Sequence, residues 1–244
     1  MSDTINEKQC ISSPHLNFDG TFDAVSTFAH EWGHAMHTLY AQKDQPYETA
    51  GYATFIAEIP STSLELLLEQ DMIQKASNDD ERLSYLGNGL ERMRGTFFRQ
   101  TMFAEFELSL YEAVERGEAL SGEKITSMYA EIVRRYHGHD DGVVIIDDAY
   151  TREWMFIPHF YYNMYVFQYA TSMTAGAALY NNMLKEGQPA VDRFIQLLRD
   201  GNSDYPFELL KKAGVDLSKP EPYLAVIEHM NTTMDEMEAI LDKV

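Results

Sequence analysis

Apolar side chains recur at every third or fourth position through most of this chain of 244 residues, which is the spacing of helices that bury one face. The pattern is clearest between Thr21 and Ala41, where Thr21 follows Asp19-Gly20 in the position of an N-cap. We therefore predict a mainly α-helical fold, with at most a small β-sheet or edge strand near the helix at 21–41. Further helices are predicted over residues 81–115, 121–136, 160–185, 189–199, 206–212 and 222–242.

Two short stretches depart from helical spacing. Apolar and polar residues alternate in 14–18, which predicts a strand, whereas residues 1–13 have no periodicity and are expected to be loose. Pro60 interrupts an apolar run, so it either kinks a helix or lies in the first turn of a helix that begins near Ile59. Because no internal repeat or low-complexity linker divides the chain, we predict a single domain over residues 1–244.

Composition excludes several classes of partner. The formal net charge is -20 at pH 7, whereas nucleic acids and anionic membranes attract basic surfaces, so we expect no nucleic acid and no membrane as partners. No apolar run approaches the roughly 20 residues that a membrane span needs. Cys10 is the only cysteine, so an intrachain disulfide is impossible. Because no signal-peptide pattern opens the sequence either, we expect a cytoplasmic protein.

The helix at 21–41 contains the motif His-Glu-x-x-His at residues 30–34. In a helix, His30 and His34 are one turn apart on the same face, so their imidazoles can converge on one cation such as zinc. Glu31 is rotated by about 100° from His30, which places its carboxylate beside the cation, where it can take a proton from an attacking water. The alternative interpretation is a solvated helix with two surface histidines.

A catalytic zinc usually has a third protein ligand, and the best candidate is Glu58. It is a lone carboxylate in the apolar run 52–60, and a buried carboxylate needs a cation or a strong hydrogen-bond partner. The alternative partner is an arginine, either Arg92 or Arg94. We predict that Glu58 and the two motif histidines hold one zinc ion, although these ligand types do not exclude cobalt or manganese.

Other polar residues compete for roles at this site. Glu65 could share a helix face with Glu58, and it is either the second choice for a ligand or a partner that fixes a histidine tautomer. His37 lies on the face of His30, and we interpret it as a hydrogen-bonded neighbour of the site in preference to a ligand. The run 137–142 contains two histidines and two aspartates, but no convergent spacing, so we interpret it as a polar loop and not as a second metal site.

The segments 30–37 and 55–61 together resemble the corresponding stretches of the thimet oligopeptidase-type zinc metallopeptidases, family M3. Within that family the chain looks most like oligoendopeptidase F. The similarity extends from about Pro14 nearly to the C-terminus. Three further stretches agree with it, at residues 157–162, 165–171 and 207–216.

The resemblance implies a zincin-like helical metallopeptidase catalytic domain that hydrolyses internal peptide bonds of short oligopeptides. It implies that His30, His34 and Glu58 hold the zinc. It also implies that Glu31 accepts the proton of the attacking water and later delivers it to the leaving amine.

The family implies a further role for the segment that follows residue 157. There, a histidine and tyrosines hydrogen-bond the oxyanion that forms on the attacked carbonyl, which assigns this role to His159 and Tyr169, and also to Tyr165. If the helix at 160–185 is continuous, the two tyrosines are one turn apart and share a face. Which hydroxyl reaches the oxyanion stays open, because the tyrosine spacing differs among branches of the superfamily.

Members of the resembled family are considerably longer and carry a large helical N-terminal region before the zinc helix. Because this chain begins close to that helix, it looks like the catalytic C-terminal part only. Two alternatives follow. In the first, the chain is a zinc-binding but inactive fragment, or half of a split enzyme that needs the missing N-terminal region or a partner chain. Otherwise it is a helical interaction protein whose motif is accidental.

Overall fold

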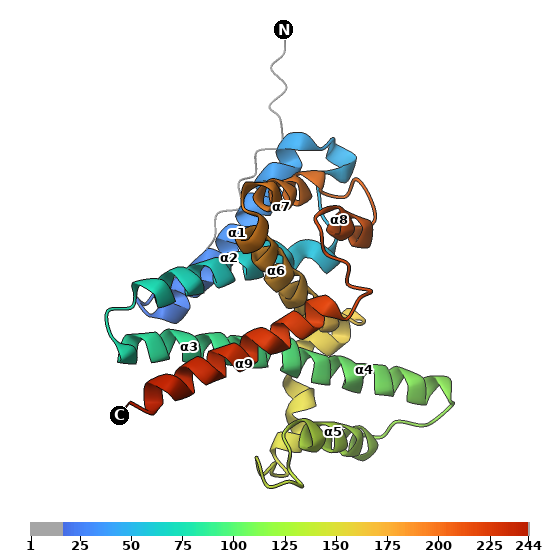
Figure 1. The fold of residues 1–244 in the computed structure, drawn as a ribbon. Helices are drawn as coiled ribbons and strands as arrows, with labels where there is room; N and C mark the ends of the chain where they lie inside the picture. Colours follow the sequence, from blue (N-terminus) through green and yellow to red (C-terminus); the bar gives the residue numbers. More distant parts are fainter. Residues whose placement is uncertain (1–16, 244) are drawn as a thin grey trace. The chain divides into compact units, whose positions relative to one another are not determined.

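The computed structural model describes residues 17–243, and every regular element within that range is helical (Figure 1). The predicted mainly α-helical fold is confirmed. The predicted loose residues 1–13 and positions 14–16 of the predicted strand lie outside the described residues, while Asn17 and Phe18 have no regular structure. No helix between residues 17 and 243 is both long enough and apolar enough to cross a membrane.

The chain divides into two compact units. Unit 1 comprises residues 1–93 and 171–244, and unit 2 comprises residues 94–170. The second boundary falls near the start of helix α6 (Phe167–Glu186), so most of α6 belongs to unit 1. The prediction of one catalytic domain over the whole chain stays a prediction.

Unit 1 is built around α1 (Phe22–Asp44) and α2 (Thr54–Lys75), which pack against each other. α1 also contacts α7 (Gln188–Asp200), and α7 contacts the short helix α8 (Pro206–Lys212). The main core lies between α2, α6, α7 and α8, where apolar side chains are removed from water. Its buried members include Ile56, Ile59, Ala175, Leu179, Phe194, Leu197, Leu198, Leu209 and Leu210.

A second layer of unit 1 consists of α3 (Asp79–Met93) and α9 (Glu221–Leu241), which lie side by side (Figure 1). Leu86 of α3 and Ile240 of α9 are buried together with Ile73 of α2. A short 3-10 helix, η2 (Tyr47–Thr49), follows α1. The apolar stripes that predict these helices are therefore the surfaces by which they pack.

α1 and α2 approach each other closely at Gly33. A Cβ atom added to Gly33 would lie 2.5 Å from the Cα atom of Ser61, which is shorter than real Cβ contacts, so a side chain there would force the two helices apart. A similar close approach joins α6 to α2, because a Cβ atom on Gly176 would lie 2.8 Å from Oγ1 of Thr62. These two glycines thus allow α1 and α6 to pack closely against the middle of α2. This is the part of α2 where Glu58 faces the motif histidines.

α2 begins at Thr54 and continues through Pro60, so the alternative of a helix that starts near Ile59 is wrong. Proline has no N–H, and it therefore leaves a carbonyl of the preceding turn without its helical partner. The hydroxyls of the three residues after Pro60 donate to the backbone carbonyls of Glu58 and Ile59, at 2.6–3.1 Å. The carbonyl that would have accepted from position 60 is that of Ile56, so these hydroxyls add bonds to the helix around Glu58 and do not replace the missing one.

Unit 2 begins with a π-helical turn (Arg94–Phe98), followed by α4 (Arg99–Glu115) and α5 (Gly122–Tyr136). Two 3-10 helices follow, η4 (Tyr150–Phe156) and η5 (Pro158–Tyr162), and α5 packs against both α4 and η4. The core of this unit is rich in aromatic rings. It contains Met102, Phe103, Phe106, Tyr129, Ile132, Val133, Ile146 and Val166, with Trp154 and Phe160 packed against them.

The predicted helix over 81–115 is interrupted, because its middle turn at 94–98 is π-helical. A π-helical turn contains one extra residue per hydrogen-bonded loop and commonly marks a local irregularity in a helix. The regular apolar spacing on either side of this turn gave no signal for the interruption.

The predicted helix over 160–185 is wrong in its first turn. η5 ends at Tyr162, and the regular helix α6 starts only at Phe167. Between them, Asn163 and Met164 have φ values of 54° and 59°, whereas an α-helix requires negative φ at every residue. Tyr165 therefore does not lie on the helix that carries the later tyrosine of the predicted pair.

Candidate metal centre

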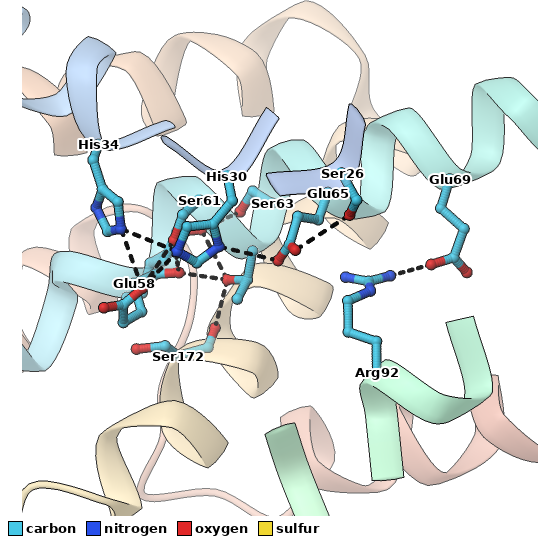
Figure 2. Close-up of polar contacts among 12 residues, drawn as sticks. Ser26, His30, His34, Glu58, Ser61, Ser63, Glu65, Glu69, Arg92 and Ser172 are labelled. Atoms are coloured by element: carbon cyan, nitrogen blue, oxygen red, sulfur yellow. Dashed lines mark hydrogen bonds and ion pairs between the residues drawn. The ribbon is translucent and has the colours of Figure 1, made fainter. Parts of the chain in front are cut away.

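Three side-chain atoms from α1 and α2 converge in unit 1 (Figure 2). Nε2 of His30 lies 3.2 Å from Nε2 of His34, and Oε2 of Glu58 lies 3.3 Å from each of these nitrogens. Within residues 17–243, these side chains are the one group of histidines, cysteines and carboxylates close enough together to hold a metal ion. The structure thus brings together the three residues that the sequence singles out as ligands.

The size of this triangle fits a tetrahedral zinc ion. Ligand atoms about 2.0–2.1 Å from a tetrahedral zinc are about 3.3–3.4 Å from one another. The edges of 3.2, 3.3 and 3.3 Å agree with that spacing. Two imidazoles and one carboxylate are also a ligand set of catalytic zinc sites, in which the fourth position is left for water or substrate.

The charges around the triangle favour a cation. Burial opposes the charged form of His30, but Glu58 and Glu65 outweigh it and raise the pKa of this imidazole to about 10. Burial also opposes ionisation of Glu58, yet His30 and His34 outweigh it and hold the pKa of this carboxyl well below its usual value. Glu58 is therefore ionised at neutral pH, and the site stabilises a positive charge beside it.

Further polar contacts orient the candidate ligands (Figure 2). Oε2 of Glu65 lies 3.4 Å from Nδ1 of His30, and Ser26 donates a hydrogen bond of 3.4 Å to the other carboxylate oxygen of Glu65. A carboxylate at Nδ1 favours the tautomer in which Nε2 carries no proton and is available to a metal. Ser61 donates to Oε2 of Glu58 at 3.2 Å, a contact that the sequence alone did not suggest.

Glu65 therefore lies beside a histidine and outside the triangle, which matches its predicted alternative role as an orienting partner. The predicted alternative of a salt bridge between Glu58 and Arg92 is wrong, because Arg92 pairs with Glu69 (Figure 2). Glu31, the predicted proton acceptor, is half-buried on α1 directly after the first motif histidine. Its role in proton transfer stays a prediction.

His37 is fully buried but is not a hydrogen-bonded neighbour of the site, so that interpretation is wrong. Its ring stacks on Tyr52 with a centroid distance of 3.7 Å and an interplanar angle of 9°. Neither ring nitrogen has a hydrogen-bond partner among the described residues. Burial, and the nearby His34 to a smaller extent, lower the pKa of His37 to about 3, so this ring is neutral at pH 7.

The three predicted oxyanion donors lie together in unit 2. The ring centres of His159, Tyr165 and Tyr169 are 5.4–5.9 Å apart, and the Tyr169 hydroxyl lies 3.5 Å from Nε2 of His159. Tyr162 completes the cluster, with ring distances of 5.9 Å to His159 and 6.0 Å to Tyr165. We call these four residues the ring cluster. Their action on an oxyanion stays a prediction.

The run 137–142 is a turn, as predicted. The His137 ring contacts the carbonyl oxygen of Val133 at 2.9 Å, and Nδ1 of His139 accepts the backbone N–H of Ile146 at 2.9 Å. Both imidazoles therefore contact backbone groups of neighbouring residues.

The fold is helical, and one metal-sized triangle is formed by a His-Glu-x-x-His helix and a glutamate from the following helix. This is the architecture of an α-helical metallopeptidase. The chain belongs to peptidase family M3, because the model of that family matches residues 12–229.

The chain is also similar to individual members of the family. It is 45% identical over 229 residues to the oligopeptidase PepF of Bacillus subtilis (strain 168), which covers 94% of this chain and 34% of that protein. It is 37% identical over 228 residues to an oligoendopeptidase F of Lactococcus lactis subsp. cremoris, which covers 93% of this chain and 37% of that protein.

Solved structures agree with the fold. The crystal structure of oligoendopeptidase-F from Enterococcus faecium matches with a TM-score of 0.79 and 34% identity, over 91% of this chain and 40% of that one. A putative peptidase from Chlamydophila abortus matches with a TM-score of 0.82 and 36% identity, over 92% of this chain and 37% of that one. The chain thus spans about a third of the length of the relatives that it matches.

Proposed function

We propose that this chain is the catalytic part of a zinc-dependent endopeptidase that hydrolyses internal bonds of short oligopeptides. The triangle formed by His30, His34 and Glu58, in a chain of family M3, is the observation that carries the proposal. The two relatives described above are called oligopeptidase and oligoendopeptidase, which supports short peptides as the substrate class.

The proposed roles follow from the chemistry of each side chain. His30, His34 and Glu58 would hold one zinc ion. A zinc ion bound there would lower the pKa of a water molecule and polarise the scissile carbonyl. Glu31 accepts the proton of the attacking water and returns it to the leaving amine, a transfer that contributes about 10²–10⁴-fold in rate. Glu65 keeps the His30 ring in the orientation that ligation needs.

The ring cluster of unit 2 supplies the remaining groups. We assign hydrogen-bond donation to the oxyanion to His159 and Tyr169, with Tyr165 as the further candidate. Removal of one such donor typically costs about 10²–10³-fold in kcat. The close packing of these rings supports a shared role.

A second candidate function follows from the length of the chain relative to its relatives. A chain that spans about a third of each relative could bind zinc and still be inactive until the remaining region, or a partner chain, completes the substrate groove. In that case the protein is half of a split enzyme.

One experiment separates these candidates. The chain is purified, its zinc content is measured, and cleavage of a set of quenched fluorescent peptides is followed with a chelator and after zinc is restored. We expect one zinc per chain and cleavage that stops with chelator and returns with zinc. Glu31→Gln should keep the zinc and lower cleavage by at least about 10²-fold, whereas Glu48→Gln, at an exposed position of unit 1, should match the wild type.

The outcomes discriminate between the two functions. Stoichiometric zinc without cleavage of any peptide would contradict an enzyme that acts alone and would support the split-enzyme candidate. A chain that retains no zinc would contradict both candidates. Equal cleavage by the wild type and Glu31→Gln would remove Glu31 from the mechanism.

A further inference from the structure

The backbone directly before Tyr165 is left-handed at two consecutive residues. Asn163 has φ 54° and Met164 has φ 59°, and within residues 17–243 they are the only residues other than glycine with positive φ. Asparagine tolerates this region, but an unbranched apolar residue such as methionine occupies it only when its surroundings enforce it. Something must therefore hold the pair in this conformation.

Helix α4 provides the restraint. Oε1 of Glu107 accepts the backbone N–H of Met164 at 2.8 Å, and the hydroxyl of Tyr111 donates to Oδ1 of Asn163 at 3.3 Å. Glu107 and Tyr111 are four residues apart, so they project from the same face of α4. Each left-handed residue thus has its own hydrogen bond to that face.

Glu107 is an unusual residue for such a task, because it is only 2% exposed. Its second oxygen, Oε2, is buried and has no hydrogen-bond partner in the described part of the chain. Burial raises the pKa of this carboxyl, and the bond from Met164 opposes that rise. Because a buried carboxyl with an unsatisfied oxygen is destabilising, its presence indicates that the bond to Met164 matters.

The restrained pair lies at one end of the segment 160–164, which carries Tyr162 and joins His159 to Tyr165 of the ring cluster. At the other end, Phe160 packs edge-on against Phe103 and Phe106 of α4, with ring distances of 5.5 and 5.4 Å. Both ends of the segment 160–164 are therefore attached to α4. The side chain of Tyr162 is 60% exposed between these two attachments, so core packing alone does not fix its direction.

We propose that Glu107 and Tyr111 are positioning residues that hold Asn163 and Met164 left-handed and thereby fix the direction of Tyr162 and Tyr165. They touch the backbone and the side chain of the loop, and they act on the reaction only through the ring cluster. The catalytic consequence rests on the proposed function, whereas the structural restraint does not.

The test combines hydrogen exchange with kinetics on the full chain. Glu107→Ala removes the acceptor, Glu107→Gln keeps an amide oxygen that can accept the same bond, and Tyr111→Phe removes only the hydroxyl. Glu105→Ala is the matched control, because Glu105 also lies on α4 but pairs with Arg135 on the surface. Exchange is measured by mass spectrometry for peptides that cover 157–169 and for peptides that cover α5.

For Glu107→Ala we expect exchange in 157–169 to accelerate at least tenfold while α5 is unchanged. We expect kcat to fall about tenfold with KM within twofold, since the loop would act on the transition state and not on substrate binding. Glu107→Gln should restore both quantities to within threefold of the wild type. Tyr111→Phe should give the same pattern at about threefold, and Glu105→Ala should change neither.

Equal acceleration of 157–169 and α5 in Glu107→Ala would overturn the proposal, because it would mean that Glu107 merely supports the core. Unchanged exchange in 157–169 would overturn it as well. If Glu107→Ala does not fold, Tyr111→Phe decides by the same criteria. A wild type that cleaves no peptide would refute the proposed function, and the exchange data would still decide whether the loop is restrained.

Discussion

The metal triangle of unit 1 and the ring cluster of unit 2 are positioned by different means. In unit 1, the ligands lie inside two long helices that meet at Gly33, so backbone packing sets their distances. In unit 2, His159 and Tyr165 lie outside regular α-helix, and the left-handed pair before Tyr165 depends on side-chain hydrogen bonds from α4. Repetitive backbone geometry fixes the first site, and a few individual contacts fix the second.

This difference determines which substitutions matter. A site on packed helices is sensitive to volume, because added atoms displace whole helices. A site on an irregular segment is sensitive to the loss of single hydrogen bonds, because no repeated backbone pattern replaces them. The following substitutions test that contrast, from the largest expected effect to the smallest.

The largest effect is expected when a candidate ligand is removed. Glu58→Ala deletes one corner of the triangle, so we expect the chain to retain no zinc after dialysis. Glu65→Ala leaves the corner atoms in place and removes only the contact to Nδ1 of His30, so zinc affinity should fall by about 10–100-fold. Zinc content by atomic absorption and competition with a chromophoric chelator measure both. Wild-type zinc affinity in Glu58→Ala would rule out Glu58 as a ligand.

A smaller effect is expected from volume at the helix contact. Gly33→Ala places a Cβ atom 2.5 Å from the Cα atom of Ser61, so we expect a loss of about 1–3 kcal/mol in the free energy of unfolding of unit 1. Gly87→Ala is the control, since its Cβ would meet only Cε of Met237 at 3.8 Å and should stabilise α3 by about 0.5–1 kcal/mol.

Urea titrations of the two alanine variants, in a chain whose Trp154 is replaced by Phe, report on unit 1 through Trp32. If Gly33→Ala proved as stable as Gly87→Ala, the metal triangle of unit 1 would not be sensitive to added volume. The contrast with the ring cluster of unit 2 would then be wrong.

The smallest effects concern pH and are opposite in sign within unit 2. Burial raises the folded-state pKa of Glu107, so its contribution to stability declines as pH rises from about 4.5, the unfolded value, through the folded-state pKa. Lys124 and Arg116 lower the pKa of Glu118 to about 2, so its contribution is present above pH 4.5 and disappears as pH falls towards 2.

Urea titrations between pH 2 and 7, followed through Trp154 and compared with Glu107→Gln and Glu118→Gln, measure these two trends. The Glu118 side chain is 33% exposed and its partners lie at the surface, so its trend should be the weaker one. Trends of the same sign would show that the buried carboxyl is stabilised in its charged form by contacts other than the bond from Met164.

The sequence predicts the features that depend on local spacing. Thr21 caps α1 as expected, with its side chain accepting the N–H of Ala24 at 3.2 Å. His30 and His34 meet because a helix brings every fourth residue back to the same face. Glu58 could be predicted to join these histidines because a lone carboxylate in an apolar run requires a partner.

The features that sequence reasoning missed depend on contacts between distant segments. Nothing in the local pattern around Met164 reveals that the chain is left-handed there, because the restraint comes from Glu107, far away in the sequence. The importance of Gly33 likewise depends on where Ser61 lies in space. The stacking of His37 on Tyr52 is a third case, since helical spacing placed His37 correctly but not its neighbour.

Gly33, between the two motif histidines, also limits which mutations the protein can accept. Every single-nucleotide change that alters a glycine codon adds a side chain or ends the chain, and at position 33 any side chain would meet the backbone of α2. A side chain at this position would push α1 away from α2 and would carry His30 and His34 away from Glu58. A residue that does not touch the metal triangle therefore helps to set its dimensions.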